Sequence, residues 1–338
     1  MGIGGTPVAV NTCTDVDSQP VYVLTALAVG PTSTSTNKAR RMIQYEVAKL
    51  TVPPVPAALT LVGPNPTASM PSSNPFNIIG NDGNDPVTGN ACGGVGKPAI
   101  GTVTDQAIGG ETPTQLASDA RNTLITAIPS NRLSNYTGVD GCTPDVQNTE
   151  NTANTLFSTV SGLNSIVQDV QNSATQTAQN NPTVATSCAG ISNCISSLGT
   201  DAIPKVTVVD GDLTLSGATS GAGILLVTGT LTYTGNFSFD GVVMVVGAGK
   251  LVAKGGGAGQ FNGAVVVANI GNNSGCSTGT QPCYSTEPTQ ANLLSSLGSP
   301  TLDWSGGGGN GIQYDTCALS LANSAASYAV IARREVTY

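Results

Sequence analysis

The chain has 338 residues and a net charge of −8, and only 9% of its residues are charged, against roughly 25% in an average globular protein. Its apolar content of 39% excludes an intrinsically disordered chain. With only 12 lysines and arginines, it lacks the basic surface that nucleic-acid-binding proteins present. The 42 glycines and the abundant serine, threonine and asparagine indicate an extracellular β-rich protein, and we expect no nucleic-acid partner.

The first part of the chain predicts a β-hairpin followed by an extended segment. Residues 21–29 and 42–50 are strand-like runs joined by a threonine- and serine-rich link. Residues 52–75 are rich in proline, which favours an extended chain leaving the hairpin. Further short strand-like runs follow at 58–62, 76–79 and 98–103. We interpret these runs as the first coil of a solenoid, which a long excursion then interrupts.

Helical signals mark that excursion. Residues 112–115 (TPTQ) combine a threonine cap, a proline at the first helical position and a glutamine three residues after the cap. A second helix is predicted by apolar residues at helical spacing: Leu156, Val160, Leu163, Val167 and Val170. A third, shorter helix is predicted around Ile191, Ile195 and Leu198. We expect these stripes to pack on the flank of the solenoid, with binding of a partner as the alternative.

The stretch 206–270 repeats itself. Its short apolar runs alternate with glycine-centred breaks, as in strands joined by tight turns. Comparable runs open at offsets of 18, 18 and 22 residues, at Val206, Ile224, Val242 and Ala264. A second set recurs at offsets of 18 and 20 residues: Leu213, Leu231 and Leu251.

A period of about 20 residues predicts a right-handed parallel β-helix, in which each coil stacks on the last. Glycines are expected at its corners: Gly211, Gly217, Gly229, Gly235, Gly247 and Gly263. An antiparallel meander of the same strands is the alternative. We favour the β-helix because the spacing is nearly constant and no two-residue hairpin motif repeats with it.

Beyond residue 270 the chain contains a cysteine loop, a predicted short helix at 291–297 and a final strand at 328–338. That strand is expected either to pair with the N-terminal hairpin or to close the solenoid. The fold class is thus mainly β, with five segments: a β-hairpin (1–51), a linker and first coil (52–103), a helical insertion (104–203), the β-helix coils (204–270), and a disulfide loop with a capping strand (271–338).

The eight cysteines predict disulfides. The chain has no histidine and no CxxC pair, so the usual zinc sets have no support, and disulfides formed in an oxidising compartment are favoured. Two local pairs are predicted, Cys188 with Cys194 and Cys276 with Cys283. The partners of the other four stay open: Cys13, Cys92, Cys142 and Cys317.

The disulfides predict export, yet the chain begins without a signal peptide and no apolar run approaches the ~20 residues that span a bilayer. We therefore expect that Met1-Gly2 is a cloning start and that a targeting or anchoring segment lies upstream. Contact with a membrane is expected only through that missing N-terminal helix.

Asp210 and Asp212 are the strongest catalytic candidates. Their spacing can place both carboxylates on one face of a strand. Paired carboxylates cleave glycosides, and β-helix folds host pectin-degrading enzymes. We favour the alternative, a turn between strands, because Thr228 and Thr230 occupy the same positions one coil later. A Ser–His or Cys–His pair is excluded by the absence of histidine.

The loop at residues 81–85 (NDGND) offers oxygen ligands for calcium from Asn81, Asp82, Asn84 and Asp85. Its spacing differs from that of an EF-hand loop, and asparagine and aspartate are ordinary turn formers. We therefore predict no metal site, no cofactor and no catalytic residue.

Several strings resemble one family. They include VDGDLTLSGATSGAGILLVTGTLTYTGNFSFDGVVMVVG, GGGAGQFNGAVVVAN and the terminal GIQYDTC and YAVIARREV, with FNIIGND, PAIG, SNRLSNYTG and TPDVQN as further parts. Together they look like the soluble region of bacterial PilX-like type IV pilus assembly proteins, over most of 57–338. The resemblance implies a leader and a hydrophobic anchoring helix upstream. None of these strings is a catalytic motif, so no functional residue is carried over.

The resemblance implies a non-enzymatic protein of the type IV pilus system, acting in assembly, as a minor filament component or in adhesion. Pilus proteins or surface polymers would be its partners. It would be extracellular or at the cell surface, and periplasmic during assembly. The alternatives are a secreted β-helix enzyme that degrades polysaccharide and a scaffold whose coils stack end to end.

Overall fold

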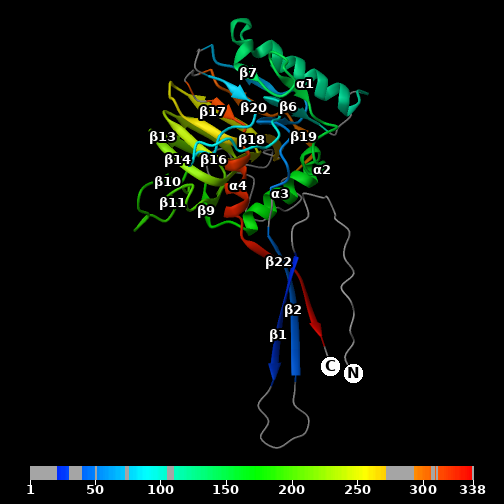
Figure 1. Ribbon diagram of the computed structural model, residues 1–338, viewed down its shortest axis with the longest axis vertical. Helices are drawn as coiled ribbons and strands as arrows, with labels where there is room; N and C mark the ends of the chain where they lie inside the picture. The colour runs from blue at the N-terminus through cyan, green and yellow to red at the C-terminus, as the bar shows by residue number, and fades with distance from the viewer. Residues whose placement is uncertain are drawn as a thin grey trace, which may run out of the picture. The chain divides into compact units, whose positions relative to one another are not determined.

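A computed structural model describes residues 21–29, 40–49, 52–72, 76–104, 110–271, 293–305, 309 and 311–336. The chain divides into two compact units: unit 1 contains residues 1–51 and 328–338, and unit 2 contains residues 52–327. Strands dominate both, and most strand pairs of unit 2 are parallel (Figure 1). The predicted β-rich class is therefore confirmed.

Unit 1 is a three-stranded antiparallel sheet in the order β1-β2-β22. The predicted hairpin is formed by β1 (Val21–Val29) and β2 (Arg40–Lys49). The last strand, β22 (Tyr328–Val336), pairs with β2 along its length. Of the two positions predicted for this strand, it takes the one beside the hairpin.

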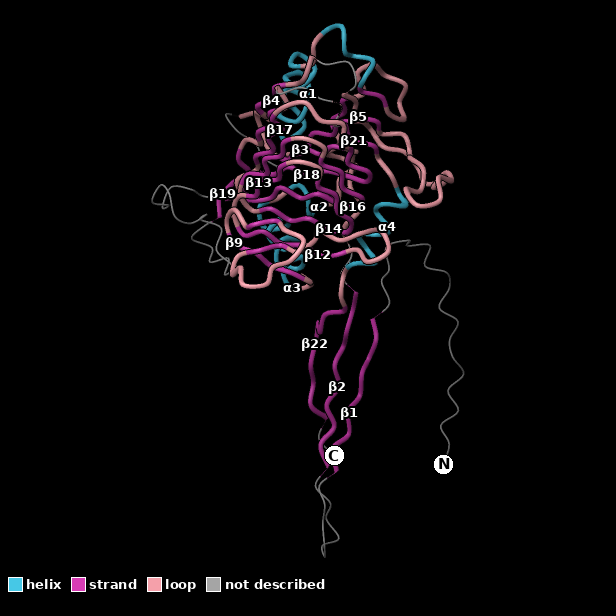
Figure 2. The backbone as a smooth tube through the Cα atoms, turned by 90° about the vertical axis from the view of Figure 1, so that its left-hand side faces the viewer, coloured by secondary structure: helices cyan, strands magenta, loops and turns pink. Residues whose placement is uncertain are grey.

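Unit 2 contains a twelve-stranded and a five-stranded sheet, between which the chain alternates. The larger sheet receives β12 (Lys205–Asp210), β14 (Thr219–Val227), β16 (Phe237–Gly247) and β18 (Gln260–Gly271). Between these, the smaller sheet receives β13 (Leu213–Ser216), β15 (Thr230–Thr234) and β17 (Lys250–Lys254). Figure 2 shows the strands stacked along the unit.

The sequence repeat correctly predicts the register of both sheets. Aligned positions in the larger sheet are Val206, Ile224, Val242 and Ala264. Those in the smaller sheet are Leu213, Leu231 and Leu251. All of these pairs are parallel, so the antiparallel meander is wrong. Gly263 was predicted at a corner but lies within β18. Five of the six glycines predicted for corners have positive φ. The exception is Gly229, where an added Cβ would lie 2.4 Å from the carbonyl carbon of Gly211.

A column of glycines crosses the larger sheet in register: Gly223, Gly241 and Gly263. Their φ angles are +114°, +137° and +119°, which residues with a Cβ rarely adopt. A Cβ on Gly241 would lie 2.0 Å from the carbonyl oxygen of Gly223, and one on Gly263 equally close to that of Gly241. Glycine is therefore required here on grounds of both conformation and space.

The N-terminal strands lie beyond β18 and not beside β12. Strand β3 (Leu59–Val62) pairs with β18 on one side and with β6 (Ile100–Val103) on the other. Next to β6 lies β8 (Val146–Asn148), while β9 (Gln176–Gln179) pairs with β12 near the opposite end. Strands β3 and β6 thus belong to the same sheet as the repeats, and they continue the stack after its last repeat.

The remaining strands complete the two sheets. In the larger sheet, β21 (Gly311–Gln313), β5 (Ile78–Ile79) and β7 (Tyr136–Thr137) extend from β18 by parallel pairing. In the smaller sheet, β20 (Thr301–Asp303) and β4 (Thr67–Ser69) follow β17.

Helix α1 (Pro113–Ala127) begins as predicted. The Thr112 side chain accepts a hydrogen bond from the backbone of Gln115, whose own side chain accepts one from the Thr112 backbone. The helix packs on β6, β8 and β4. Its buried residues are Leu116, Ala117, Ala120 and Leu124. A 3-10 helix (Ser130–Asn135) follows.

Helices α2 (Thr155–Ser158) and α3 (Val160–Asn172) lie in the segment that returns the chain from β8 to β9. The predicted stripe is divided between them, since Leu156 lies in α2 and is 37% exposed. The α3 part buries Leu163, Ile166, Val167 and Val170 and packs against β12, β18 and β19 (Leu293–Gly298). Packing on the sheet is therefore confirmed for α3. Helix α4 (Thr316–Ala325), which was not predicted, packs on β14 and β16.

Two predicted helices are wrong. Ile195 and Leu198 are buried, but β11 (Cys194–Ile195) is a short strand parallel to β10 (Thr183–Val184). Likewise, the segment predicted as a helix at 291–297 contributes β19, which pairs antiparallel with β18. In both cases tertiary pairing overrides a weak helical pattern, as expected for segments too short to form a stable helix alone.

An aromatic cluster fills part of the interior of unit 2. The ring centroids of Phe237 and Phe261 are 5.3 Å apart, and that of Tyr233 lies 5.5 Å from Phe261. Phe76 and Trp304 lie 4.7 Å apart, and Trp304 is only 1% exposed. The single tryptophan is therefore a buried reporter of folding in unit 2.

We predict that Leu59→Ala lowers the free energy of unfolding by about 2–5 kcal/mol, because it leaves a cavity where β3 joins β18. Leu59 is fully buried. Urea unfolding followed by Trp304 fluorescence measures the change. The matched control is Val95→Ala, at a side chain that is 82% exposed, where the expected change is within about 0.5 kcal/mol. Equal effects of the two substitutions would contradict the assigned strand pairing.

Candidate functional site

The two aspartates considered as an acid pair hold a turn. The Asp210 carboxylate is 4% exposed, and its Oδ1 accepts a hydrogen bond from the Thr228 hydroxyl at 3.1 Å. Oδ1 of Asp212 accepts one from the backbone N–H of Thr230 at 2.6 Å. Between the two aspartates, Gly211 has a φ of +123°. Each carboxylate thus binds the next repeat, as expected for the turn that we favoured over an acid pair.

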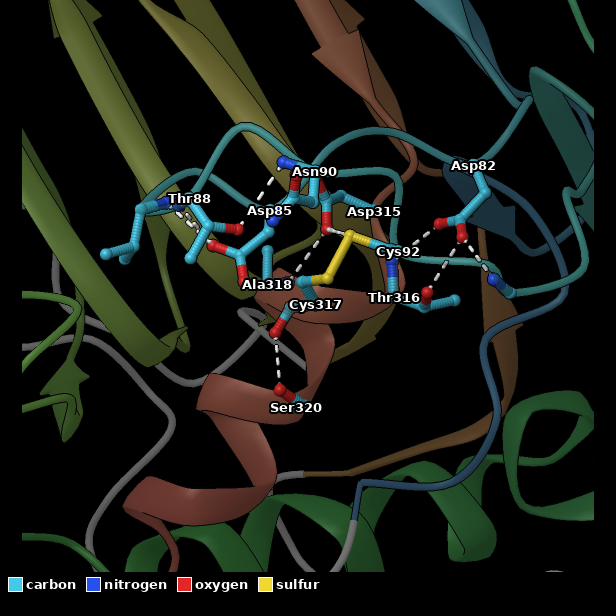
Figure 3. The surroundings of a disulfide bond; sticks show 12 residues. Asp82, Asp85, Thr88, Asn90, Cys92, Asp315, Thr316, Cys317, Ala318 and Ser320 are labelled. Atoms are coloured by element: carbon cyan, nitrogen blue, oxygen red, sulfur yellow. Dashed lines mark hydrogen bonds between the residues drawn. A yellow bond between two sulfur atoms is a disulfide. The ribbon is translucent and has the colours of Figure 1, made fainter.

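The loop considered for calcium, at residues 81–85, uses its carboxylates in the same way. Oδ1 of Asp82 accepts the backbone N–H of Thr316 at 2.8 Å, and its Oδ2 accepts the Thr316 hydroxyl at 2.9 Å and the Gly94 backbone N–H (Figure 3). Oδ1 of Asp85 accepts the backbone N–H groups of Val87 and Thr88, which lowers its pKa. These carboxylate oxygens accept hydrogen bonds that tie the loop to α4 and close its own turn.

A disulfide between Cys92 and Cys317 joins this loop to the start of α4 (Figure 3). Asp315, only 1% exposed, caps the helix by accepting the Ala318 backbone N–H at 2.9 Å. Burial raises the pKa of Asp315. The Sγ of Cys92 lies 3.2 Å from Oδ1 of Asp315. Cys92, Asp315 and Cys317 are thus close enough to share a metal, but the disulfide occupies both sulfurs, so the group joins loop to helix.

The other cysteines divide into three cases. The predicted Cys188–Cys194 disulfide is present. Cys142 is exposed and has no disulfide partner in the part of the chain that the structure describes. Cys13, Cys276 and Cys283 lie outside the described residues, so the Cys276–Cys283 pairing stays a prediction.

One polar row was not predicted from the sequence. Asp240 on β16 lies in register with Asn262 on β18, which lies in register with Gln313 on β21. The Asn262 amide donates to Oδ1 of Asp240 at 2.7 Å. Burial, together with the charges of Asp201 and Asp315, raises the pKa of Asp240 to about 6. The repeated motifs FDG at 239–241 and FNG at 261–263 were the signal that could have revealed this row.

Asp240 can gain or lose a proton in mildly acidic solution, because burial raises its pKa to about 6. The other carboxylates of the region mainly accept backbone N–H groups and hydroxyls. The arrangement therefore orders the loops around α4 and adds one titrating group to the sheet.

No family model, curated protein or solved structure matches this chain. Among the described residues, no helix is both long enough and apolar enough to cross a membrane.

We predict that Asp240→Asn stabilises the protein at about pH 7.5, by about 1–2 kcal/mol after allowance for solvent screening. The folded-state pKa of about 6 exceeds the unfolded value of about 3.9, so the folded protein binds the proton more tightly, and stability falls as pH rises through this window. The asparagine side chain still offers an acceptor oxygen to Asn262. The difference in stability between the variant and the unmodified protein should therefore vanish near about pH 4, where Asp240 is protonated in the folded protein.

Urea unfolding followed by Trp304 fluorescence at both pH values is the measurement. Asp119→Asn, at an exposed carboxylate on α1, is the matched control and should change stability little at either pH. If Asp240→Asn increased the free energy of unfolding equally at both pH values, a raised pKa at this residue would be contradicted.

Proposed function

We propose that this chain is a non-enzymatic cell-surface protein of the type IV pilus system, acting in assembly, as a minor filament component or in adhesion. We also propose that its stacked parallel strands form a right-handed β-helix that presents a surface rich in hydroxyl and amide groups. The observation that carries the proposal is that the two longest strings resembling PilX-like proteins, at 209–247 and 255–269, form one in-register stack from β12 to β18.

The disulfides support the cellular setting. Cys92–Cys317 and Cys188–Cys194 are bonded, and such bonds persist outside the reducing cytosol. This agrees with a protein that is extracellular or at the cell surface, and periplasmic during assembly. Its partners would be pilus proteins or surface polymers, recognised over broad polar faces.

The enzyme alternative loses its main support, because Asp210 and Asp212 are both engaged in holding the turn between repeats. An acid pair for glycoside cleavage needs carboxyl groups that face a shared substrate.

The scaffold alternative is weakened at two edge strands of the larger sheet, β8 and β9, where backbone groups are already bound. At one end, the Arg121 side chain of α1 donates to the carbonyl oxygen of Val146 on β8. At the other end, the Asn193 side chain accepts the backbone N–H of Gln179 on β9 at 2.9 Å and donates to its carbonyl oxygen at 3.3 Å. Backbone groups bound in this way are closed to the strand of a second copy.

Immunogold electron microscopy of native cells, with antibodies raised to this chain, tests the proposed function. We expect label along thin surface filaments or at their tips, because a pilus component is exported with the fibre. The label should disappear from the surface when the pilus assembly genes are deleted.

A strain that lacks the gene for this chain provides the control for antibody specificity. Label confined to the culture medium, and unchanged in the pilus-deficient strain, would contradict a pilus role and favour a secreted protein.

A further inference from the structure

Strand β1 is an open, apolar sheet edge. Only β2 pairs with it among the described strands. The side chains of residues 21–27 are all exposed, and those of Val23, Leu24 and Leu27 are 53%, 56% and 56% exposed. A long apolar edge of this kind is a template for pairing with another strand.

The two edges of unit 1 differ in charge. Strand β1 contains no ionisable group except the tyrosine hydroxyl of Tyr22. On the opposite edge, β22 exposes Arg333, Arg334 and Glu335. Charged side chains on an edge strand oppose pairing with a further strand. An incoming strand is therefore accepted at β1 in preference to β22.

The β1 sequence is complementary to itself. In an antiparallel pair of two β1 strands centred on Thr25, Val23 faces Leu27 and Leu24 faces Ala26, while Thr25 faces its own copy. Each apolar side chain of this central run meets an apolar one, threonine meets threonine, and no charges are opposed. A twofold axis through Thr25 would generate both halves of this contact.

We infer that β1 pairs with β1 of a second copy of this chain, which joins the two three-stranded sheets into one continuous antiparallel sheet. The occupant is a second copy because the strand is neutral and self-complementary about one residue. This inference is independent of the proposed function, since it rests on unit 1 alone.

Sedimentation equilibrium of the full chain tests the inference. We expect the unmodified protein to form a reversible dimer. Thr25→Lys places two like charges opposite each other at the axis and should raise the dimer dissociation constant by about tenfold or more. The matched control is Ala332→Lys, on the exposed part of β22, which should leave the dimer unchanged.

A second variant covers the case in which Thr25→Lys fails to fold. Thr25→Cys should form an intermolecular disulfide on mild oxidation, and mass spectrometry should find the peptide containing position 25 linked to itself. A protein that is monomeric at every concentration, or a dimer that Ala332→Lys weakens and Thr25→Lys does not, would overturn the inference.

Discussion

The backbone pairing of β3 with β18 is the constraint on which unit 2 depends. It joins a strand near the start of the unit to one near its end, with Leu59 opposite Val265. Because β6 and β8 build on β3, this branch of the sheet relies on that contact. The helices α2 and α3 then return the chain to β9, at the other end of the sheet. A contact between such distant segments costs loop-closure entropy before other contacts offset it. We therefore expect the stack from β12 to β18, with its short connections, to form first.

The few charged residues of unit 2 serve this architecture. Asp212 holds the next repeat through a backbone N–H, and Asp82 holds the start of α4 in the same way. A carboxylate that accepts backbone N–H groups satisfies donors that a turn or a helix start would otherwise leave unpaired. Asp240 differs, because burial raises its pKa to about 6. The low charge content thus leaves much of the surface to hydroxyl and amide groups.

Local and periodic features of the fold could be predicted from the sequence. The repeat at Val206, Ile224 and Val242 indicated the register, because similar layers in a parallel stack align like with like. The cap at Thr112 was equally readable, since it depends only on neighbours in the chain. The position of β3, the strand β19 and the Cys92–Cys317 bond depend on contacts between distant segments. No local pattern in the sequence encodes those contacts. The polar row at Asp240 was visible in the sequence only as the short repeat of FDG and FNG.

The treatment of sheet edges distinguishes the two units. In unit 2, Arg121 covers the backbone of β8 and Asn193 imitates a neighbouring strand beside β9. The Cys188–Cys194 disulfide closes the loop that carries Asn193, so an oxidising environment helps to keep that edge covered. In unit 1, Arg333 and Arg334 protect the β22 edge by charge. Among the described strands of unit 1, β1 has neither kind of protection, and it is the edge that we infer to pair with a second copy.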